Sequence, residues 1–449
     1  MDRDVVIVGG GVVGAAIARQ LTRYRLDVAL LEAGPDVGAG TSKANTALLH
    51  TGFDAKPGTL EARLVARGYG LLADYAARVG IPVERTGALL VAWDDAQRAE
   101  LPGIVERSRA NGYDAIAEVS IEEVYEREPA LGPGARGGLL VPDESLICPF
   151  TTPLAFATEA VLAGCDLRRA TAVTGVERFQ GGFRVETTGG ALTARRLVNA
   201  AGLRSDEIDR MLGFDRFTDT PRRGELIVFD KLARPLVRHV VLAVPTKVSK
   251  GVLVAPTVFG NVMVGPTAED VPDKADTSST EAGQEYLRGE ASRIVPALTG
   301  YEVTAIYVGL RAATEHVDFQ IHFDDGYACA GGIRSTGLSA SMAIAEHVRD
   351  GLELELEPRD DLPALRMPNI GEAFPRPYQD ADRIAADPEY GRIVCFCERV
   401  TRGEVRDALA SPLPPADLDG LRRRTRAHMG RCQGFYCGAE LARAVGEHA

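Results

Sequence analysis

Four cysteines near the end of the chain form two short motifs that could bind a metal. Cys395 and Cys397 make a C-x-C pair, and Cys432 and Cys437 make a C-x4-C pair. Four thiolates brought together can bind zinc or an iron–sulfur cluster. Zinc knuckles usually carry C-x2-C hairpins, so the C-x-C spacing favours iron, with a zinc-stapled or disulfide-stapled tail as the alternative. Their separation from the other cysteines indicates metal binding in a reducing compartment.

A glycine-rich turn close to the first residue could bind a dinucleotide. The run Gly9-Gly10-Gly11-Val12-Val13-Gly14 fits the pattern G-x-G-x-x-G. Gly9 permits the turn, Gly11 lets the backbone approach a pyrophosphate, and Gly14 allows a helix to pack closely on a strand. The negative charge of the pyrophosphate would meet the N-terminus of the following helix.

The elements around this turn are those that a dinucleotide site needs. Hydrophobic periodicity predicts a strand at 4–8, a helix at 15–24 and a second strand at 28–31, which together make a βαβ unit. Glu32 ends the second strand, where its carboxylate would accept hydrogen bonds from an adenosine ribose. The position of the unit at the N-terminus, and the long interruption before the domain resumes, favour FAD over NAD.

The rest of the chain divides into further regions. Buried strands are predicted at 195–201 and 327–332, and a helix at 337–351 returns the chain to the first domain. Between 217 and 311 the strands are short and separated by turns, which suggests a mixed sheet. Six prolines and little periodicity at 357–390 indicate an extended linker.

Composition excludes several classes of protein. A chain of 449 residues with 45% hydrophobic and 25% charged residues is typical of a folded enzyme with two or three domains. The net charge of -12 argues against a nucleic-acid partner. No stretch approaches the roughly 18 apolar residues of a membrane span, and the first residues lack the basic region of a signal peptide. A cytoplasmic protein is expected, with peripheral docking at the inner face of the membrane left open.

Several motifs together resemble the D-amino-acid-oxidase superfamily of flavoproteins. They are the glycine run 9–14, the segment 41–52 (TSKANTALLHTG), the segment 199–202 (NAAG) and the segment 332–338 (GIRSTGL). The resemblance spans residues 1 to about 355. It implies an α/β fold with a Rossmann-type FAD-binding domain and an inserted mixed-sheet substrate domain, to which this chain adds a small helical C-terminal 2Fe-2S domain.

The resemblance also implies domain limits and cofactor contacts. The FAD-binding domain would comprise 1–80, 145–215 and 312–356, the substrate domain 81–144 and 216–311, the linker 357–390, and the 2Fe-2S domain 391–449. The residues expected to bind FAD are Gly9, Gly11, Val12, Val13, Gly14, Glu32, Thr41, Ser42, Thr46, Val173, Gly202, Gly332, Thr336, Gly337 and Leu338.

Within the superfamily, residues 50–60 (HTGFDAKPGTL) look like the branch of FAD-linked glycerol-3-phosphate dehydrogenases and oxidases, beside L-2-hydroxyglutarate oxidases. Oxidation of a secondary alcohol needs a base for the hydroxyl proton, and His50 is the candidate because histidine titrates near neutral pH. Arg311 would offer paired donors to an anionic substrate, and Lys250 a point charge.

The expected substrate is therefore a small anionic alcohol. Glycerol 3-phosphate, oxidised to dihydroxyacetone phosphate, is the first choice, and an L-2-hydroxy acid such as L-2-hydroxyglutarate is the second. Two further hypotheses stay open: an amine-oxidising opine or amino-acid dehydrogenase subunit, and an electron-transfer subunit with an inactive pocket. Residues expected to contact substrate are Thr46, His50, Lys250, Arg311, Arg334 and Ser335.

The cysteine segment is similar to the bacterioferritin-associated-ferredoxin-like 2Fe-2S domain of anaerobic-type glycerol-3-phosphate dehydrogenases. The match rests on the segments 396–401 (FCERVT) and 430–434 (GRCQG) together with Cys437. It implies that all four cysteines hold a 2Fe-2S cluster. An oxidase that uses oxygen would not need this cluster. A dehydrogenase is expected, with electrons passing to a partner subunit or a quinone system, and with a hetero-oligomer as one possible assembly.

Overall fold

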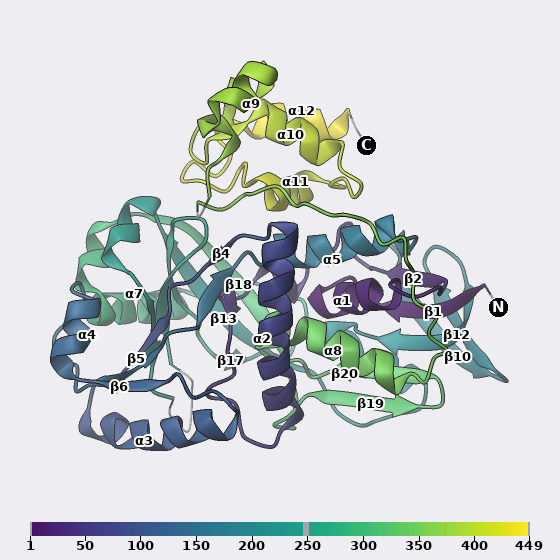
Figure 1. Ribbon diagram of the computed structural model, residues 1–449, viewed down its shortest axis with the longest axis horizontal. Coiled ribbons are helices and arrows are strands. Elements are labelled where there is room, and N and C mark those ends of the chain that lie inside the picture. The colour runs from purple at the N-terminus through teal and green to yellow at the C-terminus, as the bar shows by residue number, and fades with distance from the viewer. Residues whose placement is uncertain (1, 246–250, 373, 448–449) are drawn as a thin grey trace.

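The computed structural model describes residues 2–245, 251–372 and 374–447. Two large sheets stand side by side, and a small helical module, which we call the cysteine module, sits above the seam between them (Figure 1). In this part of the chain no helix has the length and apolar character needed to cross a bilayer.

The first sheet has eight strands and carries the predicted βαβ unit. Its strands are β1 (Arg3–Val8), β2 (Val28–Leu31), β9 (Asp166–Arg168), β10 (Val173–Phe179), β11 (Gly182–Thr187), β12 (Leu192–Asn199), β19 (Gln320–Asp324) and β20 (Tyr327–Gly331). β1 runs parallel to both β2 and β12, and its valines and isoleucine are almost fully buried. Such strands need helices on their faces. Three helices pack together there: α1 (Val12–Leu21), α5 (Thr151–Leu162) and α8 (Gly337–Gly351).

Several element boundaries differ from the predictions, and the shift of the first helix matters most for the site. The first helix runs from Val12 to Leu21, whereas the sequence predicted 15–24. Gly11 is the N-cap residue, so the two valines of the glycine run already belong to the helix. The turn and the first helical residues therefore overlap, which brings the amide groups of the helix N-terminus to the edge of β1.

The second sheet has nine strands of mixed direction. Its strands are β5 (Ala88–Val91), β6 (Ala117–Val119), β7 (Gly138–Val141), β13 (Thr220–Phe229), β14 (Val240–Ala243), β15 (Leu253–Pro256), β16 (Val262–Gly265), β17 (Glu269–Asp270) and β18 (Val303–Ala313). β13 and β18 form its long antiparallel pair. The helices α3 (Asp95–Ala110), α4 (Ile121–Arg127) and α7 (Glu281–Ile294) border this sheet, and α6 (Ser205–Met211) contacts the first one.

A small sheet links the two large ones. β3 (Leu48–Leu49) pairs with β8 (Ser145–Ile147), which also pairs with β4 (Val83–Glu84). Beside it, α2 (Leu60–Val79) packs against α8. Thr59 caps α2, and its hydroxyl accepts a hydrogen bond from the amide of Ala62. This sheet fixes the segment that follows β3.

The cysteine module has its own hydrophobic core. It contains β21 (Ile393–Cys395), β22 (Val400–Thr401), α10 (Arg402–Leu409), α11 (Leu418–Thr425) and α12 (Gly438–Gly446). The predicted linker at 357–390 is only partly extended, because the short helix α9 (Ala381–Ala386) lies within it. Asp380 caps α9 by accepting from the amide of Arg383, a local signal that the many prolines around it obscured.

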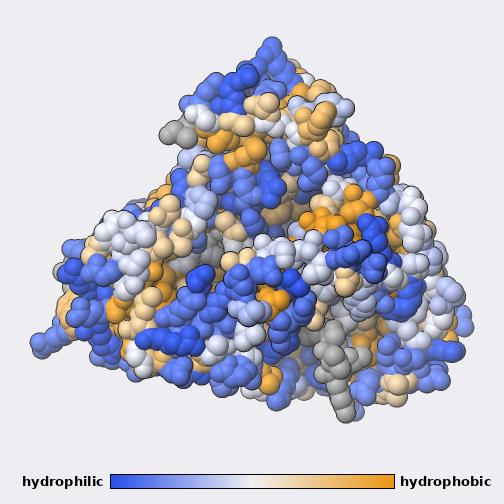
Figure 2. Space-filling view, turned by 180° about the vertical axis from the view of Figure 1, so that it is seen from behind, coloured by the Kyte–Doolittle hydropathy of each residue, from blue (hydrophilic) through white to orange (hydrophobic). Residues whose placement is uncertain are grey.

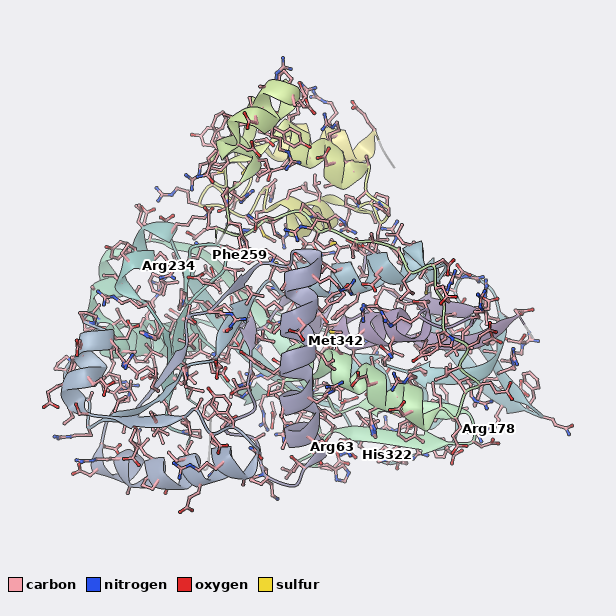
Figure 3. All side chains as sticks on the ribbon, viewed as in Figure 1. Arg63, Arg178, Arg234, Phe259, His322 and Met342 are labelled. Carbon is pink, nitrogen blue, oxygen red and sulfur yellow. The ribbon has the colours of Figure 1, made fainter. Side chains whose placement is uncertain are left out.

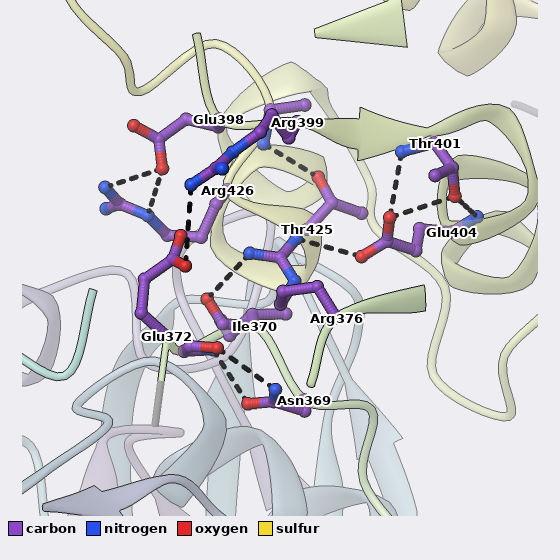
Figure 4. A network of polar contacts seen from close by, with 12 residues as sticks. Asn369, Ile370, Glu372, Arg376, Glu398, Arg399, Thr401, Glu404, Thr425 and Arg426 are labelled. Carbon is purple, nitrogen blue, oxygen red and sulfur yellow. Dashed lines mark hydrogen bonds and ion pairs between the residues drawn. The ribbon is translucent and has the colours of Figure 1, made fainter. Parts of the chain in front are cut away.

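The linker is fixed to the cysteine module by a buried ion pair. Arg376 is 1% exposed, donates to Glu404 at 2.9 Å, and also reaches the carbonyl of Ile370 (Figure 4). Glu404 in turn accepts from the amide and hydroxyl of Thr401, which caps α10. A buried charge is tolerated when its partners satisfy it in this way, so the linker and α10 form one unit.

The module is fixed to the second sheet by a further set of charges. Lys231 lies 2.7 Å from Glu372 of the linker and 3.1 Å from Glu398, the residue after Cys397. Glu398 also pairs with Arg426, whose guanidinium lies 4.1 Å from the centre of the Phe259 ring. Figure 3 labels Phe259 directly beneath the module. Seen from behind, the module forms the apex of a largely hydrophilic surface (Figure 2).

Candidate functional site

The glycine turn has the close contacts that a pyrophosphate site requires. Gly9 has a φ of 105°, and a Cβ there would lie 2.3 Å from the carbonyl oxygen of Ala200. A Cβ at Gly14 would lie 1.8 Å from the carbonyl oxygen of Gly9. Larger residues are excluded at both positions, so the backbone of the turn lies against β12 and α1 begins directly behind it.

Glu32 closes the turn from the end of β2. Its two carboxylate oxygens accept hydrogen bonds from the amides of Gly10, at 2.7 Å, and Gly34, at 2.6 Å. Burial raises the pKa of Glu32, while the two amide bonds oppose that effect. The carboxylate is thus held in place next to the glycine turn, where the ribose of a dinucleotide would meet it.

The loop that follows β2 folds back over the helix N-terminus. The amide of Gly38 donates to the carbonyl of Gly10 at 2.9 Å, and the Ser42 hydroxyl accepts from the amide of Val12 at 2.9 Å. The Thr41 hydroxyl donates to the carbonyl of Leu310 in the second sheet. Predicted cofactor residues of this loop therefore lie between the glycine turn and β18, and the partly buried Thr46 belongs to the same loop.

The other predicted cofactor residues come from three separate segments. Val173 is the first residue of β10. Two residues before it, the amide of Thr171 donates to the carbonyl of Glu32. Gly202 follows β12 with a φ of 59°. The last segment, 332–338, begins after β20 with Gly332, whose φ is 58°, and leads into α8. Its Thr336 donates to Glu61 of α2. All these segments begin where strands of the first sheet begin or end, and the donors and glycines present there fit an extended dinucleotide.

His50 lies between two carboxylates. Its Nδ1 is 2.7 Å from Glu144 Oε1 and its Nε2 is 2.9 Å from Asp54 Oδ1. The amide and hydroxyl of Thr51 also donate to Glu144 Oε1. The other carboxylate oxygen, Glu144 Oε2, has no hydrogen-bond partner among the described residues. The backbone amide of His50 donates to Ser339 at the start of α8. The two carboxylates therefore fix the ring, and α8 fixes the backbone of the same residue.

These carboxylates determine the protonation state of the ring. Burial alone would lower the pKa of His50, but the charge of Glu144 and the hydrogen bonds to Asp54 and Glu144 outweigh it and raise the pKa to about 10. His50 is consequently an imidazolium at neutral pH in this structure. Sequence reasoning did not identify either partner. Asp54 is four residues from His50 but was not recognised as its partner, and Glu144 belongs to no recognised motif.

Arg311 is a guanidinium without an ion-pair partner among the described residues. It lies on β18 directly opposite Arg222 of β13, and its Nη2 donates to the carbonyl of Thr267 at 2.6 Å. Arg222 has its own bidentate partner, Asp270. Burial, and next the charge of Arg222, lower the pKa of Arg311 to about 10. Two like charges placed opposite each other favour an anion between them.

The remaining substrate candidates differ in position. Arg334 is close enough to add to the positive field at Arg311, and it donates to the carbonyl of Val317 at 3.0 Å. Ser335 is exposed. Lys250 lies outside the described residues. The structure thus brings two of the three predicted cations together, and adds Arg222, which the sequence did not single out.

The four cysteines lie in two pairs. Cys397 is in hydrogen-bonding contact with Cys432, and Cys395 with Cys437. Within the described ranges, no three His, Cys, Asp or Glu side chains meet as the ligands of a single metal ion. Two pairs of thiolates are nevertheless the donor set that a 2Fe-2S cluster takes, with two cysteines on each iron. The arrangement therefore fits a two-iron cluster.

Comparison with known proteins covers the chain in two parts. The family model "FAD dependent oxidoreductase" matches residues 4–350, and the model "BFD-like [2Fe-2S] binding domain" matches residues 393–447. A glycerol 3-phosphate dehydrogenase of Caloramator mitchellensis is 35% identical over 455 residues, covering 99% of this chain and 94% of that protein.

Two further similarities come from one organism. The glycerol 3-phosphate oxidase of Mycoplasma pneumoniae is 32% identical, covering 78% of this chain and 94% of that protein. The solved structure of dithionite-reduced L-alpha-glycerophosphate oxidase from Mycoplasma pneumoniae with FAD bound superimposes with a TM-score of 0.78 at 30% identity, covering 82% of this chain and 99% of that one.

Proposed function

Because the chain belongs to the family of FAD dependent oxidoreductases and ends in a BFD-like 2Fe-2S domain, we propose that it is a glycerol-3-phosphate dehydrogenase. The reaction would convert the secondary alcohol of glycerol 3-phosphate to the ketone of dihydroxyacetone phosphate. Support comes from the names of its relatives in Caloramator mitchellensis and Mycoplasma pneumoniae, the first of which matches along nearly the whole chain.

The observation that carries this proposal is the pairing of Arg222 with Arg311 across two strands. One carboxylate, Asp270, faces these two guanidiniums, and Arg334 adds a third positive charge nearby. A phosphate dianion would balance this excess better than a single carboxylate would. Arg311 also has donors to spare, because its one described hydrogen bond ends on a backbone carbonyl.

The role proposed for His50 is to take the proton of the substrate hydroxyl. FAD, when bound, supplies the acceptor for the hydride that leaves the adjacent carbon. The imidazole must first be neutral and its Nε2 must separate from Asp54, because a ring that already carries both protons accepts none. Glu144 would keep Nδ1 oriented throughout this exchange, as a positioning residue.

Electrons are proposed to leave through the cysteine module to a partner. Phe396, Phe435 and Tyr436 are 71%, 83% and 74% exposed and lie within two residues of the cluster cysteines in the chain. Exposed aromatic residues of this kind are enriched in protein interfaces, so this face is the proposed docking surface for an acceptor protein. Arg431 and Gln433, which flank Cys432, contact Asp230 and Thr304 of the second domain.

Anaerobic reduction of the bound flavin by single substrates tests the proposal. Glycerol 3-phosphate should bleach the flavin absorbance within the mixing time of a rapid-flow experiment, and L-2-hydroxyglutarate and amino acids should bleach it at least about a hundredfold more slowly. Faster bleaching by L-2-hydroxyglutarate would favour the hydroxy-acid alternative, for which Arg311 would bind a carboxylate. If none of these compounds bleaches the flavin, the hypothesis that remains is an electron-transfer subunit with an inactive substrate pocket.

Oxygen distinguishes a dehydrogenase from an oxidase. The substrate-reduced enzyme should react slowly with dissolved oxygen and rapidly with a one-electron dye. Rapid reoxidation by oxygen alone, equal to the rate with the dye, would show that the cluster is not needed as the exit and would contradict the assignment as a dehydrogenase.

A further inference from the structure

A buried ion-pair cluster joins α11 of the cysteine module to the loop after β2. The Asp36 side chain has no exposed area and accepts from Arg424 Nη2 at 3.0 Å and from Arg423 Nη2 at 3.1 Å. The two arginine side chains are also almost fully buried, at 4% and 6% exposure. Arg169 of the first domain lies 3.8 Å from the same carboxylate. Asp36 is thus neutralised mainly by the module.

The contact is close as well as charged. A Cβ at Gly420, in α11, would lie 2.6 Å from Asp36 Oδ2, so the helix backbone itself approaches the carboxylate. Arg424 donates further to the carbonyls of Leu413 and Gly420, which fixes its guanidinium. At the other end of the loop, Lys43 is paired with Asp419 at 3.1 Å. The module therefore holds the loop at two points.

The opposite side of this loop covers the glycine turn. Gly38, two residues after Asp36, donates to the carbonyl of Gly10. Ser42, one residue before Lys43, accepts from the first amide of α1. Residues 36–43 are consequently packed between α11 of the module and the helix N-terminus at which a pyrophosphate binds.

We propose that the cysteine module is a clamp on the FAD site, in which Asp36, Arg423 and Arg424 act as positioning residues for the loop over the pyrophosphate. With the module docked, the loop stays closed and FAD is retained; with the module displaced, the loop loses both of its outer contacts. Binding of FAD and docking of the module then favour each other, and the effect must be reciprocal. This coupling does not depend on which alcohol is oxidised.

Two matched variants of the full chain test the clamp. Arg424→Met removes the buried contact to Asp36 and keeps a side chain of similar length. Arg431→Met is the control, because Arg431 docks the module onto Asp230 of the second sheet, at 2.9 Å, and does not contact the loop. FAD release after dilution, followed by flavin fluorescence, should be about tenfold faster in Arg424→Met and within about twofold of the parent in Arg431→Met.

The visible absorbance of the cluster reports whether the module is folded in each variant. Unchanged FAD release in Arg424→Met with an intact cluster spectrum, or equally fast release in both variants, would overturn the proposal. Should Arg424→Met fail to fold, hydrogen exchange in the unmodified protein gives the reciprocal measurement. The amides of α11 should exchange several-fold more slowly when FAD is added to the apoprotein, and equal exchange rates with and without FAD would contradict the clamp.

Discussion

The two carboxylates around His50 give the proposed base an unusual starting state. An imidazole with a pKa near 6.5 would be largely neutral at pH 7.5, whereas Glu144 and Asp54 raise the pKa of His50 to about 10. Because the protonated form carries the charge that both carboxylates attract, the ring loses its second proton only as the pH approaches this value. The pH dependence of the reaction therefore tests the role of a single side chain.

For His50 as the base, kcat/KM should rise with pH up to about 10, since this parameter reports the protonation state of the free enzyme. Asp54→Asn removes one contribution that raises the pKa, so the rise should move to lower pH. His50→Gln should reduce the rate of flavin reduction by roughly 10² to 10⁴ and abolish the rise. A profile for the parent enzyme that falls with increasing pH below 10 would instead indicate that the imidazolium itself is the active form.

Arg311 permits a separate test of substrate charge. Arg311→Met removes the guanidinium but leaves Arg222 paired with Asp270. The KM for glycerol 3-phosphate should increase by at least about tenfold, as expected when a charge-assisted hydrogen bond is lost, and uncharged glycerol should show no such change. Measurement of both KM values in one buffer checks this. A similar increase for both alcohols would mean that Arg311 supports the fold of the pocket and not the anion.

At the scale of elements, the sequence predicted the strands and helices better than their contacts. β2 and α8 have the predicted limits, and the FAD-binding fold with its second, mixed sheet is confirmed by the family match. These elements are encoded locally, by runs of apolar residues and glycines. The carboxylates at Glu144 and Asp36 were missed because their partners are 94 and 388 residues away, and no local pattern signals such a contact.

One contact between elements requires a glycine, because no side chain fits at that position. A Cβ at Gly309 would lie 2.0 Å from the carbonyl oxygen of Ala44, so β18 and the loop of Thr41 and Ser42 touch through their backbones. Gly309→Ala should push this loop away from the sheet and weaken FAD binding at least about tenfold, measured by titration of the apoprotein. Gly289→Ala is the control, because nothing lies within 4 Å of a Cβ on that helical glycine. It should leave FAD affinity unchanged and raise stability by up to about 1 kcal/mol.

At the scale of the whole molecule, the cysteine module has its own core and is docked onto the rest of the chain by charged contacts. Sequence analysis treated it as a separate domain behind an extended linker, and the cysteine spacing and the resemblance were sufficient to predict the 2Fe-2S domain, which is confirmed by the family match. The spacing contained no information on docking. Docking depends on charges such as the partly buried Lys231 and the buried Glu398, which come from distant segments of the chain.

Substitution of Lys231 should separate the reduction of the flavin by substrate from the transfer of electrons to the cluster. Lys231→Met removes its pairs with Glu372 and Glu398, which hold the linker and the cysteine module on the second sheet. Reduction of the flavin by substrate should keep its rate, because Lys231 belongs to neither the His50 nor the Arg311 site. Transfer of electrons from flavin to the 2Fe-2S cluster, followed as a second absorbance phase, should slow by about tenfold or more, because a looser module samples longer distances.

Arg392→Met is the control, since Arg392 is exposed and pairs only with Glu389 among the described residues. Equal slowing of both phases in Lys231→Met would show that the module also shapes the substrate site, and an unchanged second phase would show that other contacts suffice to hold the cluster in place.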